Sequence, residues 1–256
     1  MRICLVSSLL VLLACGGGEP KSTPPAAQDS PSRSAALEHV DPAQAGSIRG
    51  RVRVEGALPK PASIAMQADA WCKNHHDTPP ADESLLVSDG GLANAFVWIE
   101  TGLEAYQFDT PTQKKELDQV GCIFGPRVSG VMVGQALTAL NSDPVLHNVH
   151  SKPKLNSGRN IALPRIGASR DFVFDKPEIM VPIVCDVHPW MRAFVGVVSH
   201  PYYAVSAADG SFALPEVPAG DFTLAVWHET LGVQRQQLTV AAQIGSEATD
   251  FVYRLP

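Results

Sequence analysis

The stretch CDVHPWM, from Cys185 to Met191, is the most informative part of this sequence for the fold, because it places a thiol, an imidazole and a thioether in one short segment. The segments on either side, EIMVPIV and RAFVGVV, are rich in apolar residues and predict two strands. The stretch is therefore expected to be a loop between neighbouring strands. A thiol is also common in protein cores as a small apolar side chain, so a metal-binding function requires further ligands.

The loop supplies three of the four ligands of a redox-active copper site. Copper that cycles between Cu(I) and Cu(II) is typically held by two imidazoles and one thiolate, with a weak axial thioether. Cys185, His188 and Met191 match this set except for one imidazole. The segment HNVH at 147–150 follows an Asn-Ser-Asp-Pro turn between predicted strands, and it is the best candidate for the missing ligand.

Zinc binding and cysteine catalysis fit the same loop less well. Methionine is a poor zinc ligand, and no carboxylate obviously completes a zinc set. A cysteine nucleophile needs a histidine base that a third polar residue orients, and the loop shows no such arrangement.

The composition predicts an all-β protein. The chain has 256 residues, of which 45% are hydrophobic and 18% charged, with a net charge of −6, so neither a disordered chain nor a nucleic-acid-binding protein is expected. Its 21 Pro and 20 Gly favour short strands and many turns. Long amphipathic helical periodicity is nearly absent.

The N-terminal segment MRICLVSSLLVLLAC has the layout of an export signal, with one positive charge and a short apolar run. Leu12 to Cys15 resembles the lipobox of bacterial lipoproteins, which implies a signal peptide over 1–14 and a lipid anchor on Cys15. Ordinary cleavage nearby is the alternative. Residues 15–46 are rich in Gly, Pro and Ser and are expected to be a flexible tether. The expected location is periplasmic or at the cell surface, bound to a bacterial membrane through lipid.

Two cysteines remain after Cys15 and Cys185 are assigned and Cys4 leaves with the signal. Cys72 and Cys122 would lie in an oxidising compartment and are expected to form a disulfide. The alternative is that Cys72 joins His75 and His76 in a second metal site. These two histidines, with His200 and His228, are otherwise expected at the surface or in turns.

Alternating apolar residues predict strands at 47–56 and 92–100. The polar segment 106–118 could hold one helical turn. The C-terminal segment from Tyr202 to Glu229 alternates around an Asp-Gly and a Pro-Ala-Gly turn, which predicts three antiparallel strands.

HNVH, followed roughly 35 residues later by CDVHPWM, resembles the copper loops of amicyanin-like cupredoxins of the plastocyanin superfamily. The resemblance covers about 120–199, and it implies copper bound by His147, Cys185, His188 and Met191. His150 would lie on the opposite face of a regular strand from His147 and is expected to be structural.

The resemblance also implies roles for neighbouring residues. Asn148 would hold the two ligand loops together near the thiolate. His188 would be the ligand nearest solvent, with Pro189 and Trp190 forming the electron-transfer surface. A c-type cytochrome or a periplasmic dehydrogenase would be the partner.

The segment VSAADGSFALPEVPAGDFTLAV resembles carboxypeptidase regulatory-like, transthyretin-like β modules. The expected fold is therefore all-β, with a cupredoxin-like Greek-key β-sandwich over 47–199 and a smaller β-sandwich module over 200–256, to which the strand at 47–56 could belong.

The function that this sequence favours is that of a blue, type 1 copper protein, which passes single electrons and is not an enzyme. Two alternatives stay open: a copper-carrying lipoprotein, and a metal-free structural or carbohydrate-binding β module.

Overall fold

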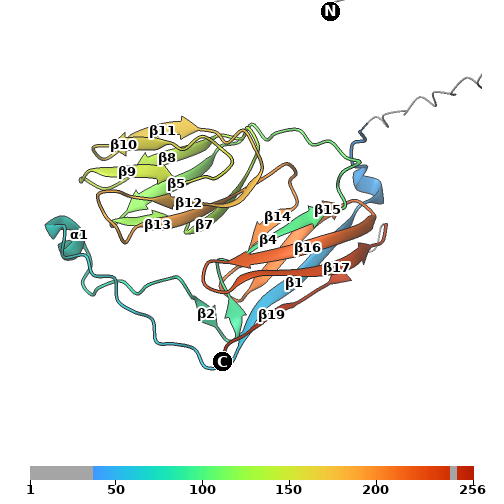
Figure 1. The fold of residues 1–256 in the computed structure, drawn as a ribbon, viewed down its shortest axis with the longest axis horizontal. Helices are drawn as coiled ribbons and strands as arrows, with labels where there is room; N and C mark the ends of the chain where they lie inside the picture. The colour runs from blue at the N-terminus through green and yellow to red at the C-terminus, as the bar shows by residue number, and fades with distance from the viewer. Residues whose placement is uncertain (1–36, 243–246) are drawn as a thin grey trace, which may run out of the picture. The chain divides into compact units, whose positions relative to one another are not determined.

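The structure, a computed structural model, describes residues 37–242 and 247–256. The expected signal peptide, Cys15 and most of the expected tether lie outside the described residues. Among the described residues, the only helical elements are the short 3-10 helix η1 (Pro42–Gln44) and α1 (Ala70–His75), and the other elements are strands. The predicted all-β class is confirmed (Figure 1).

Two sheets made from the middle of the chain form what we call the first sandwich, residues 115–198. One has five strands in the order β10-β9-β12-β13-β7: Asn160–Leu163, His147–Ser151, Glu178–Val184, Arg192–Val198 and Val128–Met132. The other has four strands in the order β11-β8-β5-β6: Ala168–Phe172, Leu137–Asn141, Lys115–Val120 and Ile123–Gly125.

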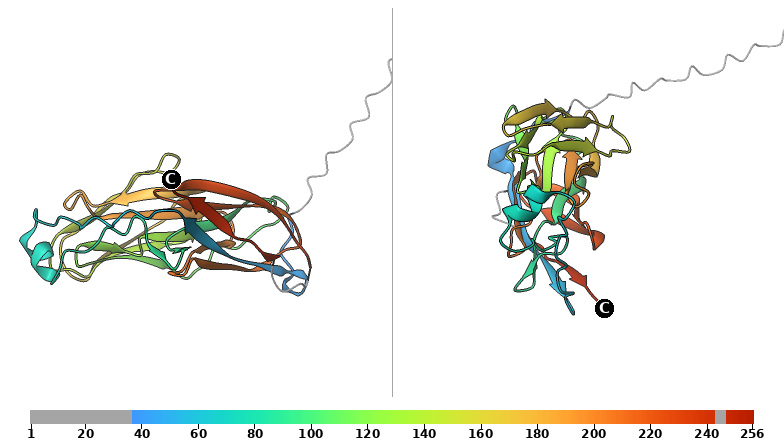
Figure 2. Two further views of the ribbon diagram at one scale, coloured as in Figure 1. Left: turned by 90° about the horizontal axis from the view of Figure 1, so that it is seen from below. Right: turned by 90° about the vertical axis from the view of Figure 1, so that its left-hand side faces the viewer.

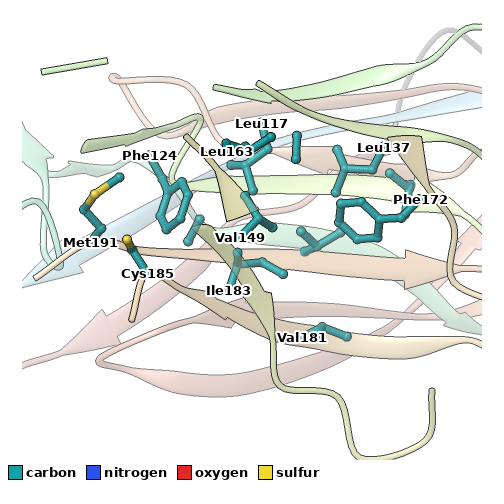
Figure 3. Close-up of a cluster of buried hydrophobic side chains, with 14 of the residues drawn as sticks. Leu117, Phe124, Leu137, Val149, Leu163, Phe172, Val181, Ile183, Cys185 and Met191 are labelled. Atoms are coloured by element: carbon teal, nitrogen blue, oxygen red, sulfur yellow. The ribbon is translucent and has the colours of Figure 1, made fainter. Parts of the chain in front are cut away.

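A single apolar core lies between these two sheets (Figure 3). Alternate residues of β8 are buried, as expected for a strand with one face on the core. The core draws on both sheets and reaches the predicted copper loop, with Leu117, Phe124, Leu137, Val149, Ile183, Cys185 and Met191 among its members. The thiol and the thioether therefore lie at one end of the same apolar core.

The strands on either side of this region in sequence form the second sandwich, residues 46–55, 87–101 and 203–254. One sheet has the order β15-β1-β3-β2, with β18 and β19 also paired to β1: Ser211–Val217, Gly46–Glu55, Gly91–Leu92, Val87–Ser88, Glu247–Ala248 and Phe251–Arg254. The other has the order β14-β4-β16-β17: Tyr203–Val205, Phe96–Thr101, Gly220–His228 and Gly232–Val240. Buried side chains of both sheets share one apolar cluster.

The strand pairings show that the first sandwich is inserted between β4 and β14. β1 pairs with β15 and β19, and β4 pairs with β14 and β16. The region 47–199, expected to be cupredoxin-like, therefore contains strands of both sandwiches. The three strands predicted in the C-terminal segment are present as β14, β15 and β16. They belong to different sheets, because β15 pairs with β1 while β14 and β16 flank β4.

The segment 106–118 contains no helical turn, since its end belongs to β5, which pairs in parallel with β8. A helix forms instead at α1, where the Asp69 side chain accepts hydrogen bonds from the backbone N–H groups of Trp71 and Cys72 and caps the N-terminus. Figures 1 and 2 show α1 at the end of the first sandwich that carries the loop between β12 and β13.

No helix in the described ranges is long and apolar enough to cross a membrane.

Candidate metal centre

The four predicted ligands lie together at one end of the first sandwich. His147 begins β9, and the other three occupy the loop between β12 and β13. None is more than 2% exposed: His147 0%, Cys185 2%, His188 1% and Met191 1%. Ligand atoms of His147, Cys185 and His188 all lie within 4.8 Å of one another.

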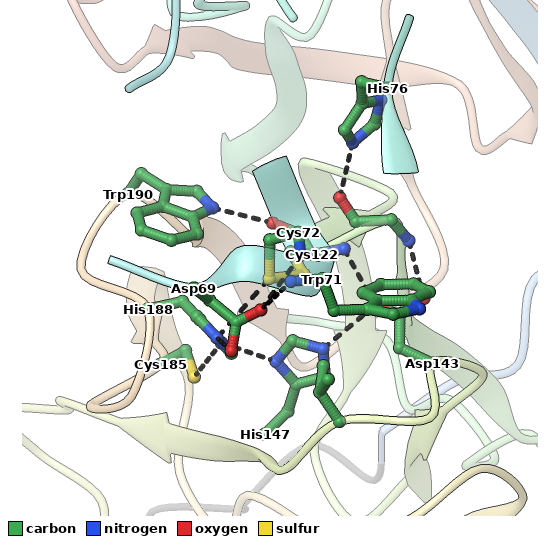
Figure 4. Close-up of a disulfide and its surroundings, with 12 residues drawn as sticks. Asp69, Trp71, Cys72, His76, Cys122, Asp143, His147, Cys185, His188 and Trp190 are labelled. Atoms are coloured by element: carbon green, nitrogen blue, oxygen red, sulfur yellow. Dashed lines mark hydrogen bonds and ion pairs between the residues drawn. A yellow bond between two sulfur atoms is a disulfide. The ribbon is translucent and has the colours of Figure 1, made fainter. Parts of the chain in front are cut away.

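The donor atoms face a common point (Figure 4). Nδ1 of His147 is 2.9 Å from Nδ1 of His188, and Sγ of Cys185 is 3.8 Å from the same His188 nitrogen. Nitrogen and sulfur ligands about 2.0 and 2.3 Å from one metal ion are separated from each other by roughly 3 to 4 Å. The spacing of these atoms therefore fits a small metal ion bound by all three.

The backbone of the loop brings Met191 back to Cys185. The N–H of Met191 donates to the carbonyl of His188 at 2.9 Å, and the N–H of Cys185 donates to the carbonyl of Met191 at 3.4 Å. Figure 3 shows the Met191 and Cys185 side chains at the same end of the apolar core, to which both belong. The short loop thus contributes the thioether, the thiol and the imidazole of His188, and β9 contributes the imidazole of His147.

The ring of His147 is oriented by Asp143, a carboxylate that is 2% exposed. Nε2 of His147 donates to Oδ2 of Asp143 at 2.9 Å, which leaves Nδ1 available as a metal ligand. The same carboxylate accepts the backbone N–H groups of Gly121 and Cys122 at 2.7 and 2.8 Å. Asp143 therefore connects this ligand to the turn that carries Cys122.

The electrostatics of the donor group favour a thiolate. Burial alone would raise the pKa of Cys185, but hydrogen bonds from His147 and from backbone N–H groups lower it below its usual value. Burial alone would lower the pKa of His147, but its bonds to Asp143 and Cys185 raise it to about 9. A thiolate is the form of cysteine that binds metals.

His188 is covered, which corrects the expectation that this ligand lies nearest solvent. Cys72 and Cys122 form a disulfide, and Sγ of Cys72 is 3.5 Å from Nε2 of His188. The carboxylate of Asp69 lies 3.6 Å from the same nitrogen. Because the disulfide fixes α1 over the loop, the outer edge of the His188 ring is shielded from solvent (Figure 4).

The other two residues of the expected electron-transfer surface do reach the surface. Pro189 is exposed and Trp190 is half-buried. The indole N–H of Trp190 donates to the carbonyl of Cys122 at 2.9 Å, and its ring centroid is 5.1 Å from that of His188. Trp190 therefore lies between the buried ligand and the outside.

Asn148 and His150 contact the two ligand loops without joining the donor group. Oδ1 of Asn148 accepts the backbone N–H of Asp186 at 2.7 Å, which links the two loops. Nδ1 of His150 is 2.8 Å from the Asp186 carboxylate. Cys72 is bonded to Cys122, and Nε2 of His76 is 2.7 Å from the carbonyl of Gly121.

Sequence reasoning missed two carboxylates, Asp143 and Asp69. Asp143 could have been noticed, because it lies in the Asn-Ser-Asp-Pro turn four residues before His147. Asp69 carries no local signal, since its approach to His188 depends on where α1 is placed by the disulfide.

Comparisons with known proteins find similar solved structures but no matching family or curated sequence. No protein-family model and no curated protein matches the sequence. Among solved structures, the chain is similar to a mutant of amicyanin in its Cu(I) form, with 20% identity and a TM-score of 0.30, over 32% of this chain and 80% of that one. It is similar to a purple cupredoxin from Nitrosopumilus maritimus, with 22% identity and a TM-score of 0.28, over 32% of this chain and 98% of that one. A Cu-containing nitrite reductase from Thermus scotoductus SA-01 matches with 21% identity and a TM-score of 0.29, over 33% of this chain and 22% of that one.

Proposed function

We propose that this chain is a type 1 copper protein that transfers single electrons. The observation that supports this most strongly is the convergence of His147 Nδ1, His188 Nδ1 and Cys185 Sγ in a buried site beside Met191. Two imidazoles and a thiolate with a weak axial thioether are the donors of blue-copper electron-transfer sites. Asp143 also fits this proposal, because its hydrogen bond to Nε2 of His147 fixes the ring and leaves Nδ1 free to bind the metal.

The protein would hold its ligands in nearly fixed positions. His147 is set by strand β9, and the other ligands by a loop closed by two backbone hydrogen bonds. Bound copper would supply a one-electron couple, and the donors of the chain would require little rearrangement between the two oxidation states. Met191, as the weak axial ligand, would tune the reduction potential.

Trp190 is the proposed exit for the electron. The His188 ring is 1% exposed, so it offers no edge to a partner. The Trp190 ring adjoins it and is half-exposed, and the exposed Pro189 lies next to it. A partner that docks over these two residues, such as a c-type cytochrome or a periplasmic dehydrogenase, would come within a ring's width of the copper ligand.

The proposed setting is the outer face of a bacterial membrane, with Cys15 lipidated and the following segment acting as a tether. Cys15→Ala should release the protein from membranes into the soluble fraction. Recovery of this variant with the membranes would contradict the anchor while leaving the copper proposal intact.

The visible spectrum of the oxidised, copper-loaded protein tests the electron-transfer proposal. We expect an intense blue band from thiolate-to-copper charge transfer, with one copper per chain. His147→Ala should abolish the band, and His150→Ala, a matched change three residues away, should keep it. A colourless copper-loaded protein, or a full band in His147→Ala, would contradict the proposed ligand set.

A further inference from the structure

The His188 ring faces sulfur on both of its sides. Its Nδ1 is 3.8 Å from Sγ of Cys185, and its Nε2 is 3.5 Å from Sγ of Cys72. A ligand atom of Cys122 lies within 4.8 Å of those of Cys72 and His188. Both cysteines of the disulfide are 0% exposed. The outer nitrogen of His188 therefore belongs to a second group of donors, on the far side of the ring from the proposed copper site.

This second group has the composition of a site for a soft cation once the disulfide is reduced. Two thiolates and one imidazole are donors that suit Cu(I). Two sulfurs on one metal ion, each about 2.3 Å away, are separated by roughly 3.8 Å. The Cα atoms of Cys72 and Cys122 are 5.7 Å apart, so rotation of the two side chains can open the sulfurs to this separation.

We propose that Cys72, Cys122 and Nε2 of His188 form a second, redox-gated Cu(I) site. In the disulfide form the site is closed, because both sulfur atoms are bonded to each other. A protein dithiol would reduce the disulfide by thiol–disulfide exchange: it supplies two electrons and two protons, leaves as a disulfide, and yields two thiols on this chain. One Cu(I) then replaces the two thiol protons and, where Nδ1 of His188 already holds copper, the proton on Nε2; all of these protons pass to solvent.

Local opening of helix α1 would let a reducing dithiol reach the buried disulfide. Helix α1 contributes only Cys72 to the buried residues, while Lys73, Asn74 and His75 are exposed. An element with few buried apolar contacts opens locally more readily than the core strands do. The capping carboxylate of Asp69 lies 3.6 Å from Nε2 of His188 and moves with α1, so local opening of the helix also withdraws this carboxylate and leaves Nε2 free for Cu(I).

A Cu(I) titration of the full chain, under anaerobic conditions against a chromophoric chelator, tests this proposal. The protein is compared with its disulfide intact and after reduction by a phosphine, and circular dichroism is recorded on the same samples. We expect the reduced chain to bind one more Cu(I) than the disulfide form. The double variant Cys72→Ser, Cys122→Ser is the matched control and should bind the same number with and without phosphine.

A second measurement separates this site from the proposed blue-copper site. Cys185→Ser removes the thiolate of the blue site but leaves Cys72, Cys122 and His188 in place. In the reduced Cys185→Ser chain, X-ray absorption at the copper edge should show two sulfur ligands and one nitrogen ligand. If the blue-copper proposal alone is wrong, the disulfide form shows no blue band while the extra Cu(I) on reduction remains.

Several outcomes would overturn the second site. Equal Cu(I) stoichiometry before and after reduction would do so, as would an extra Cu(I) that persists in the double serine variant. Loss of the β-sheet signal on reduction would also overturn it, because the donors are brought together only by the folded chain. A sulfur-only shell in Cys185→Ser would exclude His188 as a ligand.

Discussion

The two sandwiches are built alike, with an apolar core between two sheets, but they differ in what their buried histidines do. His147 and His188 in the first sandwich are 0% and 1% exposed and turn their rings toward Cys185. His228, the last residue of β16, and His200, in the bend between β13 and β14, are 1% and 8% exposed. Neither belongs to the three groups of described side chains that could hold a metal ion, which lie in the first sandwich and in the helix α1 that covers its end.

The charge state separates His147 from the other buried imidazoles. Burial alone would lower the pKa of His147, but its bonds to Asp143 and Cys185 raise it to about 9, whereas burial lowers the pKa of His188. Burial lowers the pKa of His200 to about 4, and burial with the nearby charge of Arg127 lowers that of His228 to about 4. The expectation of a surface or turn position is wrong for His228, which is buried at the end of β16, whereas His200 lies in the bend between β13 and β14 but is buried there. A histidine that is only buried is therefore a neutral core residue. A metal-binding histidine also requires neighbouring donor atoms and a carboxylate that is hydrogen-bonded to its ring, as Asp143 is to His147.

Cys185→Ser is expected to have the largest effect on the proposed copper site. A hydroxyl cannot replace the soft thiolate, so the blue band should be abolished while the circular dichroism of both sandwiches stays unchanged. Met191→Leu is the control: it should keep most of the band and mainly shift the reduction potential, because the axial bond is weak. Visible absorption and potentiometry measure the two effects. A blue Cys185→Ser protein would contradict the assignment.

Removal of the disulfide should have a large effect on stability. Cys72 and Cys122 are 50 residues apart, and a cross-link that closes a loop of this length stabilises a protein by about 4 kcal/mol in the chain-entropy model. The double serine variant should lose this amount in denaturant unfolding of the metal-free protein. An unchanged midpoint would show that the cover over His188 does not contribute to the stability of the first sandwich.

Truncation of one core residue in each sandwich should show which of the two cores supports the proposed copper site. Ile183 and Leu214 are both 0% exposed, one in each core. Ile183→Ala and Leu214→Ala should each destabilise the protein by about 2 to 5 kcal/mol, because each leaves a cavity. Only Ile183→Ala, two residues before Cys185, should also alter the blue spectrum. An altered spectrum in Leu214→Ala would show that the two cores are coupled.

Asp143→Asn should weaken copper binding by about 10- to 100-fold, which is the usual effect of removing the carboxylate partner of a metal-binding histidine. Competition with a copper chelator measures this change. Asp171→Asn is the control, since this exposed carboxylate pairs with Lys114 and contacts none of the ligands. Equal affinities in both variants would mean that Asp143 does not position His147.

The two neutral histidines should give the smallest effect, a loss of stability in acid. His200 and His228 take up protons below about pH 6.5 in the unfolded chain, but only near pH 4 in the folded chain, because their pKa is lowered to about 4 on folding. Stability should therefore fall by about 1 kcal/mol per histidine between about pH 7.5 and 5.5. His228→Asn should flatten this dependence in denaturant titrations. An unchanged slope would indicate that His228 is protonated in the folded protein.

Local signals in the sequence were sufficient for the strands that hold the ligand loop. The apolar runs before Cys185 and after Met191 correspond to β12 and β13, and the strand predicted at 47–56 corresponds to β1. These segments carry their own periodicity, so no knowledge of their partners was needed.

Other features that depend on distant contacts could not be predicted, although the Cys72–Cys122 pair was. Residues Lys115–Val120 are polar and read locally as a turn, yet they form β5 because β8 pairs with them. The cover over His188 depends on α1, which the pattern of polar residues around Trp71 did not indicate. Non-local pairing also decides that β15 joins β1 rather than β14.

The pairing of the first and last long strands of the second sandwich has a mechanical consequence. β1 and β19 are parallel neighbours from Val52 opposite Phe251 to Glu55 opposite Arg254, so tension on the two chain ends would load them in shear. The inserted first sandwich leaves and rejoins through β4 and β14, whose pairing holds Trp98 opposite Tyr203. A pulling force would therefore pass directly from β1 to β19, and the first sandwich with the loops of the candidate metal centre lies outside this path as long as β1 and β19 remain paired.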